Sequence, residues 1–240
     1  MNDSCIITGG LGGIGSAIAK SLAVAAPAVQ QHLCGLDEKA VVAGLATYHR
    51  VDVADADQVE RWLSGVSSLR YAVINAAIVS VGNLRTMRLA DWRREIDVNL
   101  NGAAYCAIAA ARAMAARGGG RIVMLGSWAA ERPHPHIPAY STAKSGLRML
   151  TKLLALEYAA DHVVVNELAP GWVDAGLSAA VWEQRPELKA IAETQVPSGR
   201  LITAEQVADE VVHLLLRASP HITGSTVTMT GALDLRSFTK

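Results

Sequence analysis

Thr8-Gly9-Gly10-Leu11-Gly12-Gly13-Ile14-Gly15 is the stretch that decides the fold. It follows the apolar run Cys5-Ile6-Ile7, and apolar residues then recur at helical spacing at Ile14, Ile18 and Leu22. Glycines permit positive φ angles and close backbone approach, while a helix N-terminus offers unpaired N–H groups and a partial positive charge. A strand, a glycine turn and a helix in this order predict a loop that binds a pyrophosphate. The alternative is a plain tight turn, which so many glycines disfavour at an entropic cost of about 0.5–1 kcal/mol each.

Along the whole chain, apolar strand-like runs alternate with longer helical patterns, which is typical of a parallel sheet covered by helices on both faces. We predict seven strands, at residues 4–8, 32–36, 47–51, 71–75, 121–126, 163–168 and 226–229. The sequence therefore predicts an α/β fold with a Rossmann-like, doubly wound sheet of seven parallel strands, in a single domain over residues 1–240. Ligands of such sheets bind beyond the carboxyl ends of the strands. Six notable residues fall at or just past those ends: Gly9, Asp37, Asp52, Asn75, Ser127 and Pro170.

Tyr140 and Lys144 lie four residues apart in a stretch with a helical pattern, and Ser127 ends a predicted strand upstream. Residues at i and i+4 share a helix face, so the ammonium of Lys144 is expected to lower the pKa of the Tyr140 phenol. A shift of ~2–3 units from the reference value near 10 would make the phenol a competent acid or base at neutral pH. Taken alone, such a pair is more often a surface tyrosine beside a solvated lysine. The glycine loop in the same chain favours the catalytic interpretation.

The order of these and further motifs resembles the single-domain branch of the short-chain dehydrogenase/reductase family. The glycine motif Thr-Gly-x-x-x-Gly-x-Gly falls on Thr8, Gly9, Gly13 and Gly15. The other matches follow in family order: Asp52-Val53, Asn75-Ala76-Ala77, Asn99, Ser127, Tyr140 with Lys144, Asn166, Pro170-Gly171-Trp172-Val173 and Ile222-Thr223-Gly224. Two residues depart from the family pattern, because Ala77 replaces the glycine of Asn-Ala-Gly and Ala175 replaces a threonine that often follows Pro-Gly-x-Val-x.

The resemblance implies an oxidoreductase that transfers a hydride between NAD(H) and a secondary alcohol or ketone, with Tyr140 as the acid/base. It also implies that Ser127 polarises the substrate oxygen, that Lys144 binds the nicotinamide ribose, and that Asn99 holds a water that relays protons. The cofactor is expected to contact Gly9, Leu11, Gly13, Ile14, Gly15, Asp37, Asp52, Val53, Asn75, Ala76, Ala77, Tyr140, Lys144, Pro170, Gly171 and Val173. A catalytically idle dinucleotide-binding sensor or scaffold is the alternative from a different functional class.

The charge of Asp37 favours NAD(H) over NADP(H). Asp37 stands 22 residues after Gly15, close to the spacing of an acid that binds a ribose 2′-hydroxyl. A 2′-phosphate would meet this carboxylate at a cost of ~4 kcal/mol per unit of like charge, at ~4 Å and an effective dielectric near 20. The glycine loop contains no Arg or Lys to bind that phosphate, and the nearby Lys39 is expected to face solvent. An NADP(H)-dependent carbonyl reductase of the same family remains the alternative.

The substrate side is expected to be lined by Trp128, Arg132, Ile137 and Trp172, together with Ser127 and Tyr140. Arg132 is a candidate to bind a carboxylate or phosphate, or else a solvated loop residue, so the charge of the substrate stays open. Residues 175–197 resemble the mobile substrate-covering segment of the family, with an ordinary surface helix as the alternative. His134-Pro135-His136 lacks a third ligand in the sequence, and no metal is expected.

Composition sets the outer limits of function. The chain has 240 residues, 51% of them hydrophobic, and a formal net charge of zero, which argues against a nucleic-acid binder. The sequence contains no apolar stretch of 18 residues that could span a membrane. The chain begins almost directly in its first strand, so a cytoplasmic location is expected. The cysteines Cys5, Cys34 and Cys106 lie in apolar segments and are expected to be reduced core residues. Expected helices at 101–117 and 140–158 are rich in Ala, Leu and Met, which together with the resemblance predicts a homotetramer of D2 symmetry.

Overall fold

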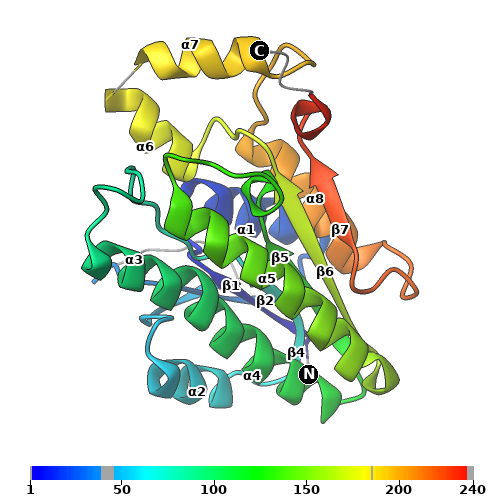
Figure 1. Ribbon diagram of the computed structural model, residues 1–240. Coiled ribbons are helices and arrows are strands. Elements are labelled where there is room, and N and C mark those ends of the chain that lie inside the picture. The colour runs from blue at the N-terminus through cyan, green and yellow to red at the C-terminus, as the bar shows by residue number, and fades with distance from the viewer. Residues whose placement is uncertain (1, 39–45, 185, 237–240) are drawn as a thin grey trace.

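A computed structural model describes residues 2–38, 46–184 and 186–236 of the chain (Figure 1). Seven strands form one sheet in this part of the chain: β1 (Ser4–Thr8), β2 (Gln30–Gly35), β3 (Ala46–Arg50), β4 (Leu69–Ile74), β5 (Gly120–Leu125), β6 (Val163–Pro170) and β7 (Thr226–Met229). Their order in the sheet is β3-β2-β1-β4-β5-β6-β7, and each neighbouring pair is parallel. The predicted Rossmann-like sheet of seven parallel strands is confirmed.

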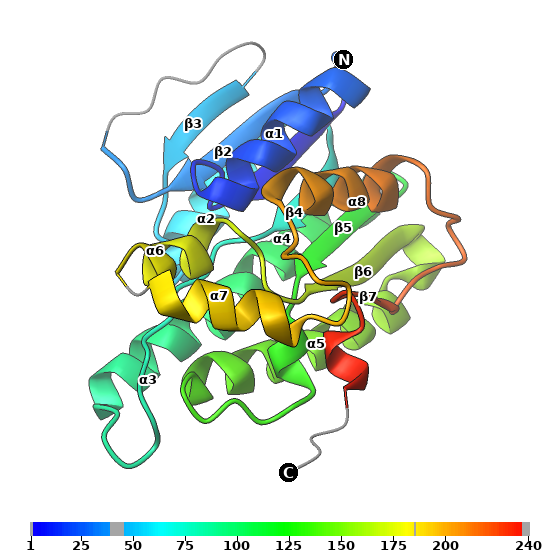
Figure 2. The ribbon, with the colours of Figure 1, turned by 90° about the horizontal axis from the view of Figure 1, so that it is seen from above.

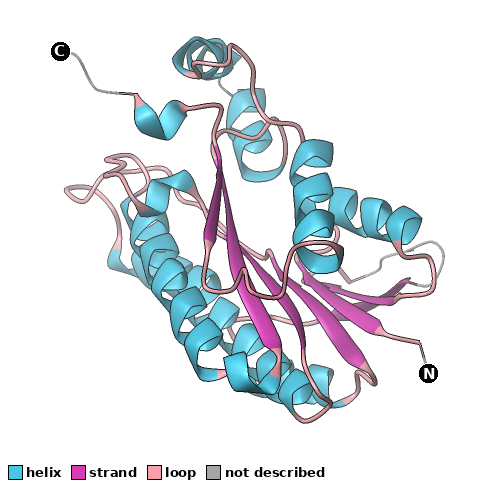
Figure 3. Cartoon of the chain, turned by 90° about the vertical axis from the view of Figure 1, so that its right-hand side faces the viewer, coloured by secondary structure: helices cyan, strands magenta, loops and turns pink. Residues whose placement is uncertain are grey.

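Helices cover both faces of this sheet (Figure 3). They are α1 (Gly13–Ala25), α2 (Ala56–Ser64), α3 (Leu89–Ile96), α4 (Ala103–Ala115), α5 (Pro138–Glu157), α6 (Gly176–Gln184), α7 (Pro186–Gln195) and α8 (Ala204–Leu216). Strand β1 shows how the two layers are built, since its side chains alternate between faces. Cys5 and Ile7 pack in the core beneath α1 and α8, whereas Ile6 packs in the core beneath α2, α4 and α5. All three are fully buried, as expected of a central parallel strand.

Strands β1 and β7 have the predicted boundaries, and the boundaries of the other five strands differ from the predicted ones by at most two residues. Strand β2 begins at Gln30, because polar residues there pair with β1 although the hydrophobic pattern does not reveal them. Strand β6 continues to Pro170, which is opposite Met229 in the register of β7. A proline is tolerated at the end of a strand because the following Gly171 supplies the N–H that bonds to the Met229 carbonyl, at 2.8 Å. Cys5, Cys34 and Cys106 are buried free thiols, as predicted.

The strand order reverses between β1 and β4, which is where ligands of doubly wound sheets bind. Helices α6 and α7 lie beyond the carboxyl ends of the strands (Figures 1 and 2). They make up most of the predicted substrate-covering segment, of which residue 185, like Lys39, lies outside the described residues. None of the described helices is both long and apolar enough to cross a membrane.

Candidate active site

The glycine loop between β1 and α1 brings backbone groups close together. Gly9 has a φ of +63°, and a Cβ there would lie 3.0 Å from both Cα of Ala76 and Nδ2 of Asn75. A Cβ at Gly15 would overlap the carbonyl oxygen of Gly9. Helix α1 begins at Gly13 without an acidic residue in its first turn, and no side chain of the described residues caps it. Its first N–H groups are therefore not used by a side-chain cap, and the predicted role of this loop in binding a pyrophosphate stays a prediction.

Thr8 connects this loop to the end of β4, a role that the motif alone did not reveal. Its hydroxyl accepts hydrogen bonds from the N–H groups of Asn75 and Ala76, at 2.8 and 2.9 Å. The Asn75 amide donates in return to the carbonyl of Thr8 at 2.9 Å. The two loops at the switch point are thus held as one unit.

A cavity of about 490 Å³ lies at the switch point. The residues predicted to contact the cofactor all line it: Gly9, Leu11, Gly13, Ile14, Gly15, Asp37, Asp52, Val53, Asn75, Ala76, Ala77, Tyr140, Lys144, Pro170, Gly171 and Val173. Its wall also includes Leu36, Ile78 and Arg94, which were not predicted, and the residues from Ala175 to Ser178, which begin the predicted substrate-covering segment. A Cβ at Gly13 would lie 2.8 Å from the backbone nitrogen of Gly176, so the start of α6 closes directly over the glycine loop.

Acidic and basic groups meet at one end of the cavity. Asp37, just after β2, is exposed and lines the wall. Both terminal nitrogens of Arg94 lie 3.4 Å from Oδ2 of Asp52, while Oδ1 of Asp52 accepts from the N–H of Ala54 at 3.0 Å. Arg94 was missed because it stands on α3, 42 residues from Asp52 in the sequence. It puts a positive charge on the cavity wall.

Helix α5 places Tyr140 and Lys144 on the same face. Nζ of Lys144 lies 5.5 Å from the centre of the Tyr140 ring and donates to the carbonyl of Leu125 at 2.6 Å. Ser127 follows β5, and its hydroxyl oxygen accepts from the N–H of Ala129 at 3.1 Å. Ser127, Tyr140 and Lys144 line the cavity together, so the structure brings three of the four predicted catalytic residues to one wall.

Burial controls the pKa values of both titratable groups. It raises the pKa of Tyr140 to about 12, although a hydrogen bond with Ser127 acts in the opposite direction and the charge of Glu95 adds to the rise. It lowers the pKa of Lys144 to about 8, against the field of Glu167. For Tyr140 the direction is opposite to the lowering that the sequence predicted, because the loss of hydration on burial is the largest effect on this phenol.

Asn99, the fourth predicted catalytic residue, is fully buried behind the cavity wall. Its amide donates to the carbonyl of Ile78 and accepts from the N–H of the same residue, both at 2.8 Å. Asn99 lies in a π-helical turn, η1 (Asp97–Gly102), an irregularity that often occurs at functional sites. Gly102 lets the end of this turn pack closely against Val53, since a Cβ there would lie 2.9 Å from the carbonyl oxygen of Val53. Asn99 therefore fixes the loop that carries Ile78 on the cavity wall.

Four of the six predicted substrate-side residues do not line this cavity. Trp128, Arg132, Ile137 and Trp172 are not part of the cavity wall formed by the described residues. Arg132 donates from Nη1 to the carbonyl of Arg236 at 2.9 Å. Ile137 directly precedes α5, and its N–H donates to the carbonyl of His134 at 3.2 Å. Of the predicted substrate contacts, Ser127 and Tyr140 are the ones on the wall.

The tryptophans instead join a separate apolar cluster that includes residues of α6 and α7. Trp128 and Trp182 are buried in it, and Trp172 packs against them. The ring of His134 meets that of Trp128 edge to face, with centroids 4.4 Å apart. Within the described residues no three potential metal ligands gather at one place.

Two further motif matches connect β6 to the segment before β7. The amide of Asn166 donates to the carbonyl of Ile222 at 2.6 Å and accepts from the N–H of Ser225 at 3.0 Å. The segment Ile222-Thr223-Gly224 thus binds to β6 and keeps that edge of the sheet in register. Its part in the site is indirect.

Comparison with known proteins defines the class. The family model described as Enoyl-(Acyl carrier protein) reductase matches residues 9–232. A cis-4-hydroxycyclohexanecarboxylate dehydrogenase of Sinomonas cyclohexanicum is 34% identical over 237 residues, 94% of each chain. A short-chain type dehydrogenase/reductase from Mycobacterium marinum is 30% identical, with a TM-score of 0.88 over 96% of this chain and 95% of the other. The chain belongs to the short-chain dehydrogenase/reductase family, NAD(P)-dependent oxidoreductases that act on CH–OH and C=O groups.

The comparisons do not reproduce the expected preference for NAD. A gluconate 5-dehydrogenase from Burkholderia cenocepacia J2315 was solved with NADP and tartrate; it is 27% identical, with a TM-score of 0.91 over 98% of this chain and 96% of the other. Two more of the solved relatives also contain NADP. The relatives thus support NAD(P) as the cofactor class and do not make NADP the less favoured member.

Proposed function

We propose that this protein transfers a hydride between NAD(H) and a secondary alcohol or ketone, with Tyr140 as the acid/base. The observation that carries the proposal is that Ser127, Tyr140 and Lys144 share one cavity with the glycine loop. Residues 1–240 would act as a single dinucleotide-binding and catalytic domain, with residues 175–197 covering the substrate.

A nicotinamide nucleotide, when bound, supplies or accepts the hydride, and its oxidised ring adds a positive charge to the site. In reduction, the Tyr140 phenol donates its proton to the substrate oxygen as that oxygen becomes an alcohol. In oxidation, the phenolate of Tyr140 takes the proton from the alcohol, and the nearby Lys144 ammonium favours that phenolate. Ser127 holds the substrate oxygen by a hydrogen bond. Lys144 binds the ribose, and Asn99 keeps the neighbouring loop in place.

Asp37 supports NAD(H) as the cofactor, because its exposed carboxylate lines the cavity where a ribose 2′-hydroxyl is expected. NADP(H) is the second candidate. It is favoured by the related structures that contain NADP and by the guanidinium of Arg94 on the same wall.

We also propose a homotetramer. Helix α5 exposes the apolar side chains of Met149, Leu153 and Leu156, which recur at helical spacing on one stripe. Pairing of this stripe across a two-fold axis would remove it from water.

A dehydrogenase screen tests the proposed activity. The purified protein is mixed with NAD or NADP and a panel that includes 4-hydroxycyclohexanecarboxylate, gluconate and simple cyclic secondary alcohols, and the reduced cofactor is followed by absorbance. Turnover with at least one alcohol is expected, with a higher kcat/KM for NAD than for NADP. Tight binding of NADH without turnover across a broad panel would favour the sensor or scaffold alternative instead.

A further inference from the structure

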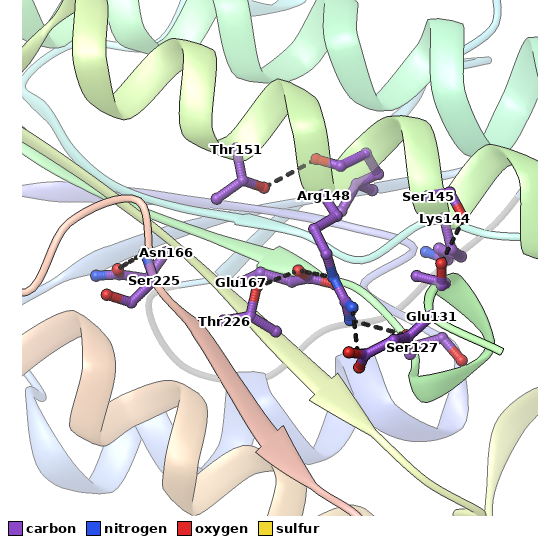
Figure 4. A network of polar contacts seen from close by, with 12 residues as sticks. Ser127, Glu131, Lys144, Ser145, Arg148, Thr151, Asn166, Glu167, Ser225 and Thr226 are labelled. Carbon is purple, nitrogen blue, oxygen red and sulfur yellow. Dashed lines mark hydrogen bonds and ion pairs between the residues drawn. The ribbon is translucent and has the colours of Figure 1, made fainter. Parts of the chain in front are cut away.

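A buried ion pair lies directly behind the proposed catalytic residues. Arg148 stands one helical turn beyond Lys144 on α5, and Figure 4 shows its guanidinium pointing toward Glu167 on β6. Nε of Arg148 lies 2.8 Å from Oε2 of Glu167, and Nη2 lies 3.3 Å from Oε1. The side chains are 17% and 0% exposed. Pairs this deeply buried often contribute little net stability, because desolvation offsets their attraction.

The guanidinium also holds the main chain of the site. Nη2 of Arg148 donates to the carbonyl oxygen of Ser127 at 3.3 Å, and Nη1 lies 3.4 Å from a carboxylate oxygen of Glu131 in the turn that follows. On the other side, the Thr226 hydroxyl donates to Glu167 at 2.7 Å. One network thus runs from β7 through β6 and α5 to the main chain of Ser127 (Figure 4).

Gly126 shows how tightly this part of the molecule is fitted. A Cβ at Gly126 would overlap the carboxylate of Glu167. The residue before Ser127 therefore packs directly against the Glu167 carboxylate, and we expect a displacement of that carboxylate to shift the main chain at Ser127.

Glu167 of this pair also acts on the charge of Lys144. Among the described charged and titratable groups, Tyr140 and Arg148 share α5 with Lys144, Glu167 acts on Lys144 from β6, and Glu95 on α3 acts on Tyr140. The negative charge of Glu167 raises the pKa of Lys144 against burial. Arg148, which neutralises Glu167, must act in the opposite direction.

We propose that the Arg148–Glu167 ion pair is a positioning unit of the active site, which holds Ser127 through its carbonyl group and balances the charge that Lys144 experiences. Neither residue is among the described residues that line the cavity. The inference rests on the proposed function for its effect on turnover, but its electrostatic part is measurable without turnover.

The electrostatic part predicts opposite shifts for the two partners. In Glu167→Gln the guanidinium loses its buried carboxylate and keeps only the exposed Glu131, and the Lys144 titration midpoint should fall by about one pH unit. In Arg148→Met the Glu167 carboxylate loses its guanidinium, and the midpoint should rise by about as much. NMR titration of isotopically labelled lysine side chains measures this, with Lys144→Met to assign the signal. The matched control is Arg121→Met, a partly buried arginine that donates to the carbonyls of Leu214 and Ala218 and should leave Lys144 unchanged.

The positioning part is tested by the double variant Arg148→Met/Glu167→Leu, in which an apolar pair replaces the ion pair and folding is expected to persist. Its kcat should fall about 10-fold or more, with NADH affinity retained within a few-fold. In the single variants that fold, the alkaline limb of the pH profile of kcat/KM should move in the same direction as the titration midpoint of Lys144.

Wild-type kcat in the double variant, or a Lys144 midpoint that moves in the same direction or not at all in both single variants, would overturn the inference. Absence of turnover in the wild type would overturn the proposed function instead, and the Lys144 titration would still decide the role of the pair.

Discussion

Tyr140 and Lys144 are both removed from water, and burial shifts each pKa in the direction that favours the neutral form of the side chain. The pKa of the phenol rises to about 12, and that of the ammonium falls to about 8. The site therefore maintains a charge that the fold disfavours. For Lys144 the difference from the ordinary value of 10.5 corresponds to roughly 3 kcal/mol, since each unit is worth about 1.4 kcal/mol. A residue held at such a cost is expected to serve function rather than stability.

Lys144→Met should therefore increase the free energy of unfolding by about 1–3 kcal/mol at pH 7, because loss of the bond to Leu125 offsets part of the gain. Between pH 8 and 10.5 the unfolded state binds more protons than the folded state, so wild-type stability rises with pH there and the difference between the proteins shrinks. Urea unfolding at pH 7 and near pH 9.5 checks both statements. Lys152→Met, at an exposed lysine of α5, is the control. A less stable Lys144→Met protein at pH 7 would refute this account.

Asp37→Ala should narrow or reverse the preference for NAD over NADP. The carboxylate's bond to the 2′-hydroxyl and its repulsion of a 2′-phosphate are lost together. The kcat/KM values for both cofactors in wild type and variant measure the change. Glu38→Ala, the neighbouring exposed acid that is not part of the cavity wall among the described residues, should keep the wild-type ratio. A wild type that already prefers NADP would show that the assignment is wrong.

At the scale of elements, the sequence predicted each strand of the sheet and the cavity wall that the glycine motif begins. Hydrophobic periodicity and the order of motifs can be read from short stretches of sequence. In a parallel sheet the carboxyl ends of the strands lie along one edge, so residues at these ends can be placed together from the sequence alone. Contacts between distant residues were not predictable in this way. Thr8 bonds to Asn75, 67 residues on, and Arg148 pairs with Glu167 across two elements. The substrate-side residues were predicted from their position in the loops next to catalytic residues. The direction of a loop depends on tertiary packing, and here Trp128 and Trp172 pack in the cluster with Trp182.

We expect that this apolar cluster holds α6 and α7 in place. Trp182→Ala should loosen the segment, because truncation of a buried tryptophan typically costs ~3–5 kcal/mol of local packing. Hydrogen exchange at residues 176–195 should accelerate at least about 10-fold and the KM for the alcohol should rise, while exchange in β1 and β4 stays the same. Ile191→Ala on α7, at a side chain 47% exposed, is the matched control. Unchanged exchange in Trp182→Ala would mean that other contacts hold the segment.

At the scale of the whole molecule, the apolar residues of α4 and those of α5 differ in their burial. Helix α4 buries Cys106, Ala110 and Met114 within the subunit. Part of the apolar surface that led to the prediction of an interface is therefore covered inside one subunit. The exposed stripe of α5, with Leu156 80% exposed, is the remaining surface. Because such stripes mark association sites, we expect two copies to pair through this one, and the resemblance to the family implies that two such pairs form a tetramer.

Light scattering coupled to size exclusion, at micromolar concentration, should give about four times the subunit mass of 25.3 kDa. Leu153→Glu, in the stripe, should reduce that mass, whereas the exposed Lys152→Glu beside it should not. A wild-type mass near 25.3 kDa would rule the tetramer out.

The central claim is that Tyr140 moves the proton in a hydride-transfer reaction, and Tyr140→Phe tests it most directly. The ring and its packing beside Lys144 remain, and the phenolic oxygen alone is lost. With the best alcohol of the screen, kcat should fall below about a hundredth of wild type, since groups of this kind contribute ~10²–10⁴-fold, while NADH affinity by fluorescence should stay within a few-fold. Activity clearly above a hundredth of wild type, with NADH still bound, would contradict Tyr140 as the acid/base.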